Sequence, residues 1–171
     1  MPNTYTLIAS NTVGSGGVSS VTFSSIPSTY TDLLIKLSAR CDNAGVTGNM
    51  AIEFNSSSSS FSRKIVRGNG SAASSTGASD NYIGDIVGNA ATSSTFSNTD
   101  IYIPNYAGSN NKSLSIDTVT ENNATEAWQY MVASLWSDSS AITSIKLTSY
   151  AAHFTNFLQY STFYLYGIKN S

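Results

Sequence analysis

The sequence predicts an all-β protein, a jelly-roll-like β-sandwich of about eight to ten antiparallel strands in a single domain that spans residues 1–171. Three observations predict it. Apolar and polar residues alternate in most of the apolar blocks, which is the period of a strand. Residues typical of turns separate these blocks. Neither a βαβ alternation nor a repeat of fixed period is visible, which favours a sandwich over a parallel α/β fold.

The strands are expected in order along the chain. The clearest is 30–40, where Leu33, Ile35 and Leu37 share one face and more polar side chains share the other. The remaining strands are expected at 4–10, 18–23, 49–54, 61–66, 82–87, 100–103, 113–119, 142–148 and 158–168. Because glycines at 14–17 tolerate a positive φ, the first two are expected to form a hairpin.

Two serine- or glycine-rich segments are expected to be loops. Five consecutive serines at 56–60 offer nothing to a core, and 68–80 consists mostly of Gly, Ala and Ser. Since an unstructured stretch of that length is unusual in a compact domain, 68–80 is expected to become ordered against a neighbouring molecule.

The segment 125–136 has two interpretations. It could be a helix, with Thr125 as its N-cap and Glu126 near the positive end of the helix dipole. It could also be a strand, with Trp128, Tyr130 and Trp136 on one face. The bulky aromatic residues and the all-β surroundings favour the strand.

The composition excludes several classes of protein. Only 11% of the residues are charged, the net charge is −2 and the sequence pI is about 5.1, which argues against a nucleic-acid partner. The polar surface comes instead from 32 Ser, 18 Thr and 16 Asn. One cysteine, Cys41, permits neither an intramolecular disulfide nor a cysteine-based zinc site. The N-terminus lacks the pattern of a signal peptide, and because no apolar run approaches 18 residues we expect no membrane partner.

The residues that enzymes need are scarce. The single histidine, His153, has no nucleophile-elbow motif beside it, and the chain has only three glutamates. Neither a phosphate-binding loop nor a calcium-binding loop is present. We therefore expect a protein that is not an enzyme and that has no cofactor.

Aromatic strands supply most of the candidate interface residues. In 158–168, Tyr160, Tyr164 and Tyr166 are expected on one face, while the other face is also apolar. The segment 125–136 has the same two apolar faces, with Trp128, Tyr130 and Trp136 as candidates. Such a strand is either covered on both sides within its own fold or contacts another subunit, because Tyr and Trp are enriched at interfaces.

A basic cluster adds two further candidates. On a strand, Arg63 and Arg67 face the same way and Lys64 faces the opposite way. These side chains either lie on a solvated face or contact an acidic partner.

Four segments together resemble a known family. They are YTLI with VTFSSIPSTYTDLLIKLSAR, then IEFN with the serines after it, then IYIPNYAGSNNKSLSIDTV, and finally STFYLYGI. The pattern is similar to small virion structural proteins of tailed bacteriophages, especially those that infect marine bacteria. The resemblance covers essentially the whole chain and implies a β-sandwich that serves as a capsid decoration (cement) protein or as a tail component. It implies no catalytic residues.

The resemblance leads to expectations about partners. A free-standing domain, with strands expected close to both ends of the sequence, favours capsid decoration, with the major capsid protein as partner and a homo-oligomer, a trimer above all, as the assembly. The protein would then be located in the virion, after assembly in the host cytoplasm. The alternative is a tail fibre or tail-tip component that binds a host glycan, with Trp128 and Trp136 as candidate contacts.

Overall fold

A computed structural model describes residues 4–121 and 127–169 of the chain. Within these residues the protein is all-β, as the sequence predicts, with twelve strands and one turn of 3-10 helix. The elements are β1 (Tyr5–Thr12), β2 (Ser20–Phe23), β3 (Asp32–Ala39), β4 (Thr47–Phe54), β5 (Phe61–Gly68), β6 (Ala73–Ala78), β7 (Tyr82–Val87), β8 (Ser97–Ile103), β9 (Lys112–Glu121), β10 (Ala127–Trp136), β11 (Ile145–Ser149), η1 (Tyr150–Ala152) and β12 (Thr162–Ile168).

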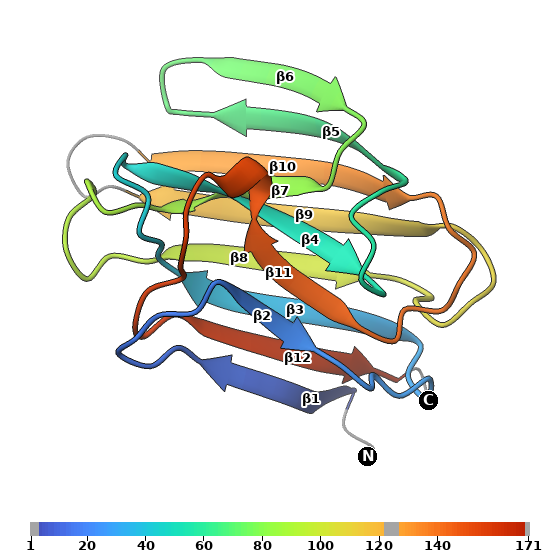
Figure 1. The fold of residues 1–171 in the computed structure, drawn as a ribbon. Helices are drawn as coiled ribbons and strands as arrows, with labels where there is room; N and C mark the ends of the chain where they lie inside the picture. Colours follow the sequence, from blue (N-terminus) through green and yellow to red (C-terminus); the bar gives the residue numbers. More distant parts are fainter. Residues whose placement is uncertain (1–3, 122–126, 170–171) are drawn as a thin grey trace.

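The strands form two antiparallel sheets of unequal size. The large sheet has eight strands in the order β1-β12-β3-β8-β9-β10-β5-β6, and the small sheet has four in the order β2-β11-β4-β7. The small sheet packs on one side of the large one, which confirms the β-sandwich (Figure 1). Because the large sheet is twice as wide, its edges at β1 and at β5–β6 extend past the small sheet.

The strand pairing is that of a long hairpin rolled into two layers. β5 pairs with β6, β4 with β7, β3 with β8, β2 with β11 and β1 with β12, each pair enclosing the one before it. This nesting is the jelly-roll arrangement. The hairpin β9–β10 is inserted between β8 and β5, so it adds two strands to the middle of the large sheet.

The core lies between the two sheets and follows the predicted alternation. Leu33, Ile35 and Leu37 of β3 are buried, and they meet side chains such as Ile52 of β4 and Leu147 of β11 in one apolar cluster. Burial of this apolar area is the main favourable term in folding. No helix in the described part of the chain could span a membrane.

Four sequence-based expectations need correction. The hairpin expected from 4–10 and 18–23 does not form, because β1 and β2 belong to different sheets. The segment 68–80 is not a continuous loop, since it contains β6, which pairs along β5. The last strand begins at Thr162 instead of 158. The total of twelve strands also exceeds the expected eight to ten.

The ambiguous segment 125–136 is a strand over its described part. β10 pairs with β9 on one side and with β5 on the other, over almost its whole length. Residues 125 and 126, which would have capped a helix, lie outside the described residues.

One loop is fixed by a buried arginine. The sequence places Arg40 on the polar face of its strand, yet its side chain is buried and donates hydrogen bonds to the backbone carbonyls of Asn89, Ala91, Thr92 and Thr95. These carbonyls satisfy a guanidinium that would otherwise be costly to bury.

Candidate interaction surface and binding pocket

The outer face of the large sheet, on the side away from the small sheet, is uncovered. Nine large hydrophobic side chains are exposed among the described residues, and the pairing register places seven of them on this face. These seven are Tyr5, Leu7, Val66, Tyr102, Val119, Met131 and Leu135. A surface of this kind is typical of a contact with another protein.

Four of the outward side chains align across neighbouring strands. Leu7 lies opposite Tyr166, Tyr166 opposite Leu34, and Leu34 opposite Tyr102, so the four cross β1, β12, β3 and β8 side by side. We call these four residues the apolar row. Tyr164 lies next to it, with its ring centre 6.4 Å from that of Tyr166 in a stacked arrangement.

Charged side chains separate the apolar row from a second exposed patch. Lys36 forms an ion pair with Asp100, which stands opposite Asp117 on the next strand. Met131 and Val66, which are opposite each other on β10 and β5, begin the second patch. Because Lys36 compensates Asp100, and the outward Lys64 and Asp117 carry opposite charges, the face carries little net charge.

The three tyrosines predicted near the C-terminus are split by the structure. Tyr164 and Tyr166 are partly exposed on the outer face, and the residues between and beside them point into the core. Tyr160 precedes the strand instead of sharing its face. It is 68% exposed, in a turn with a φ of 72°.

Two of the predicted interface residues are core residues. Tyr130 and Trp136 are each 1% exposed, so neither side chain can contact a partner or a glycan on the folded protein. Trp136 packs edge-on against Phe54, with 5.3 Å between the ring centres, and stacks on Phe61. The small sheet covers this end of β10, which the sequence pattern alone does not reveal.

The predicted orientation of the basic cluster is confirmed. Arg63 and Arg67 lie on the inner side of β5, opposite Ser134 and Tyr130 of β10, and Lys64 points outward. Arg63 forms a two-pronged ion pair with Asp80, and its guanidinium carbon lies 4.7 Å from the centre of the Tyr82 ring. The charge of Arg63 is therefore compensated within the fold.

A buried carboxylate lies between the sheets, close to both arginines. Asp85 is 6% exposed and accepts hydrogen bonds from the hydroxyls of Tyr82 and Tyr130, each at 2.6 Å. Burial, and then the charge of Asp85, raise the pKa of both phenols above its ordinary value. Both carboxylate oxygens are thus already occupied by donors.

The sequence does not reveal this network, for a geometric reason. Tyr82 and Asp85 are three residues apart, so a regular strand would point them to opposite faces. The register between β4 and β7 shifts at this point, and Gly84 has a φ of 123°. The bulge changes the alternation and turns both side chains toward Tyr130.

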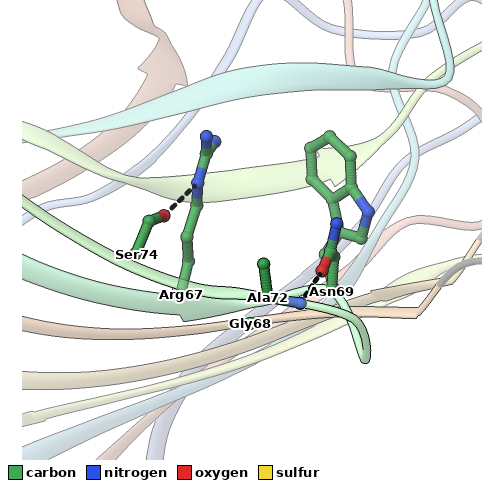
Figure 2. Close-up of a pocket in the computed structure, with 6 residues that line it drawn as sticks. Arg67, Gly68, Asn69, Ala72 and Ser74 are labelled. Atoms are coloured by element: carbon green, nitrogen blue, oxygen red, sulfur yellow. Dashed lines mark hydrogen bonds between the residues drawn. The ribbon is translucent and has the colours of Figure 1, made fainter.

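A small pocket opens beyond the edge of the small sheet. It has a volume of about 240 Å³ and lies where the turn between β5 and β6 meets β10 (Figure 2). Its lining consists of Arg67, Gly68, Asn69, Ala72, Ser74 and Trp128. Arg67 donates from Nε to Ser74 Oγ at 3.1 Å, and its guanidinium carbon lies 5.8 Å from the Trp128 ring centre. Of the two candidate tryptophans, only Trp128 is therefore accessible to a ligand.

The described residues offer little else for chemistry. No group of three or more His, Cys, Asp or Glu side chains is placed among them to hold a metal ion. His153 is exposed at the end of η1. Cys41 is buried, and burial raises the pKa of its thiol to about 11, so it is a poor nucleophile at neutral pH.

Comparisons with protein-family models, with curated proteins and with solved structures gave no match to this chain. The outer face and the pocket are therefore the structural features that bear on function.

Proposed function

We propose that the protein is a bacteriophage virion structural protein that decorates the capsid and binds the major capsid protein through the outer face of its large sheet. The observation that carries this proposal is the concentration of exposed hydrophobic side chains on that one uncovered face. The family resemblance of the sequence supports the viral setting. In this proposal the protein acts in many copies as a clamp, and it self-associates as a trimer.

The character of the face suits protein contact. The apolar row supplies two leucines and two tyrosines, and tyrosine buries a large ring while it keeps a hydroxyl for hydrogen bonding. Since the outward lysines, Lys36 and Lys64, balance Asp100 and Asp117, little net charge would be buried on docking. Binding to the shell should therefore change little with salt concentration.

Binding fits the rest of the molecule better than catalysis does. Among the described residues, the most buried carboxylate is Asp85, which is occupied by two phenol hydroxyls, and the His153 imidazole has no hydrogen-bond partner in its exposed turn. Neither has the partner that a general acid, a general base or an activated nucleophile requires.

The test is made on particles that lack the protein. They should leak DNA on heating or osmotic shock but adsorb to host cells normally. Adding back the wild-type protein should restore their resistance, whereas the Leu7→Glu and Met131→Glu variants should not occupy the shell. Both side chains are more than half exposed, so both variants should still fold.

A matched control tests whether binding depends on this face in particular or on any exposed hydrophobic side chain. Val46 is an exposed apolar residue outside the sheet, and Val46→Glu should bind the shell like wild type. If particles without the protein resist heat and osmotic shock like wild type but no longer adsorb to host cells, the result would contradict the capsid-decoration proposal and favour a tail component. A sedimentation experiment that shows monomer at every concentration would contradict the trimer.

The alternative, a tail-tip component that binds a host glycan, is favoured by one specific observation. This is the pocket with Trp128 at its wall and Arg67 beside it.

A further inference from the structure

We propose that the pocket between Arg67 and Trp128 binds a pyranose sugar that carries a carboxylate, as a hexuronic acid does. The pocket opens on the inner side of the large sheet, beyond the small sheet, and the face proposed to bind the capsid is on the other side. The two proposals are therefore independent, and either can hold without the other.

Trp128 supplies an apolar wall. It is half-buried, and its ring centre lies 6.4 Å from that of Tyr130, which anchors it against the core. An indole offers a broad face against which the C–H side of a sugar ring can pack. The volume of about 240 Å³ lies below the roughly 300–1,000 Å³ of pockets for drug-sized ligands, which suits one sugar ring.

Arg67 supplies the charge. The ion pairs among the described residues join Lys36 to Asp100, Arg63 to Asp80 and Lys146 to Glu53, and none of them includes Arg67. Its Nε is engaged by Ser74, and its end extends away from β5 (Figure 2). A guanidinium can grip both oxygens of a planar carboxylate with two parallel hydrogen bonds.

Two contacts hold Arg67 in place. Its Nε donates a hydrogen bond to Ser74 Oγ at 3.1 Å, and its guanidinium carbon lies 5.8 Å from the centre of the Trp128 ring. A side chain that is already held in this way loses less entropy when a ligand binds.

The turn between β5 and β6 supplies a further donor. Asn69 Oδ1 accepts hydrogen bonds from the backbone N–H groups of Ser71 and Ala72 at 3.1 and 2.9 Å. Gly70 has a φ of 85°, which this turn requires. Since its oxygen is bound within the turn, Asn69 presents its amide nitrogen to a ligand hydroxyl.

The charges nearby favour one carboxylate over a more highly charged ligand. Arg63 is neutralised by Asp80, and Lys64 points to the other side of the sheet. A phosphate chain calls for several clustered cations, which this pocket lacks. One guanidinium beside one indole matches a sugar that carries a single negative charge.

The experiment is a titration of the 15N-labelled full chain with the methyl glycoside of glucuronic acid. We expect millimolar affinity for a single ring, with the Trp128 indole N–H signal shifting and that of buried Trp136 unchanged. Methyl glucoside, which lacks the carboxylate, should bind at least tenfold more weakly. Methyl glucoside 6-sulfate tests whether a tetrahedral anion replaces the planar one, and it too should bind more weakly.

Variants locate the site. Arg67→Ala should weaken binding about 10- to 100-fold through loss of the charged hydrogen bonds, and Trp128→Ala should weaken it similarly. Arg67→Lys keeps the charge but cannot form two parallel hydrogen bonds to the carboxylate, so its affinity should lie between those of Arg67→Ala and wild type. Lys64→Ala removes the same charge from the same strand, on the other face, and should bind like wild type.

Several outcomes would overturn the proposal. These are equal binding of glucuronide and glucoside, equal binding of the sulfate, the same loss in Lys64→Ala as in Arg67→Ala, or no shift of the Trp128 signal at saturating sugar. Thermal unfolding of each variant shows that a loss of binding is not a loss of fold. Since purified protein suffices, failure here leaves the capsid proposal untouched.

Discussion

The two tryptophans of β10 lie on the same face of one strand, eight residues apart, and have opposite surroundings. Trp136 is 1% exposed among Phe54 and Phe61, whereas Trp128 is half-buried at the wall of a pocket beside Arg67. Both point to the inner side of the large sheet. Alternation along the strand therefore assigns the face but not the environment.

The reach of the small sheet along β10 makes the difference. Phe54 of β4 covers Trp136, whereas Trp128 lies at the other end of the strand, where the pocket opens beside the turn between β5 and β6. Between the two tryptophans lies Tyr130, which is buried yet hydrogen-bonded to Asp85. The strand thus passes from apolar core through a buried polar network to an open pocket.

The largest contrast should come from truncating each tryptophan. Trp136→Ala removes a fully buried ring and leaves a cavity, so it should lower the free energy of unfolding by about 3–5 kcal/mol. Trp128→Ala should lower it by about 1 kcal/mol, because a half-exposed ring buries less area. Urea unfolding of both variants measures this. Equal losses would mean that Trp128 belongs to the core.

The next effect concerns the network between the tryptophans. Asp85→Ala leaves the buried hydroxyls of Tyr82 and Tyr130 without their acceptor, which should lower the free energy of unfolding by about 2–4 kcal/mol. In a Tyr82→Phe/Tyr130→Phe background, the same Asp85→Ala change should instead stabilise the protein, since it removes a buried charge that has lost its donors. If Asp85→Ala still destabilises the protein in that background, the two phenols are not the groups that stabilise the Asp85 carboxylate.

The pH dependence follows from the same two phenols. Their pKa values are raised in the folded protein, so the unfolded chain releases these protons first as the pH rises above about 10. The folded state then binds more protons than the unfolded one, and stability falls with pH. The two groups together contribute a slope of up to about 2.7 kcal/mol per pH unit. Below about pH 10 this contribution is constant.

Urea midpoints between pH 8 and 11.5 measure this slope. The Tyr82→Phe/Tyr130→Phe variant is the control, and its stability should fall less steeply over the same range. If the stability of that variant falls as steeply with pH as that of wild type, other groups cause the loss of stability at alkaline pH.

Much of the fold could be predicted from local patterns. Strands such as β3 and β9 alternate clearly, and their inward residues Leu33, Ile35 and Leu114 are buried. The orientation of Arg63 and Arg67 followed from the same alternation. These features depend on neighbours in sequence, which a single chain displays directly.

Features that depend on distant contacts could not be predicted. β6 has the sequence ASSTGA, with no large apolar residue, and it is a strand because β5 offers it hydrogen-bonding partners. The bulge that brings Tyr82 and Asp85 together depends on the pairing of β7 with β4. For the same reason, the sequence named Trp128 and Arg67 as candidates without indicating the pocket between them, and it left open whether Trp136 is covered within its own fold, as the structure shows it to be.

The smallest predicted effect sharpens the role of Trp136 itself. Its indole Nε1 is buried and has no hydrogen-bond partner among the described residues. Trp136→Phe removes the unsatisfied donor, which should stabilise the protein by about 1–3 kcal/mol. It also removes part of a buried ring, which should destabilise the protein by a similar amount. The two changes therefore oppose each other. The variant should therefore stay within about 1 kcal/mol of wild type by urea unfolding, and the contacts with Phe54 and Phe61 should persist. A loss as large as that of Trp136→Ala would show that the whole indole is needed to fill the core, and that its N–H is not a source of instability.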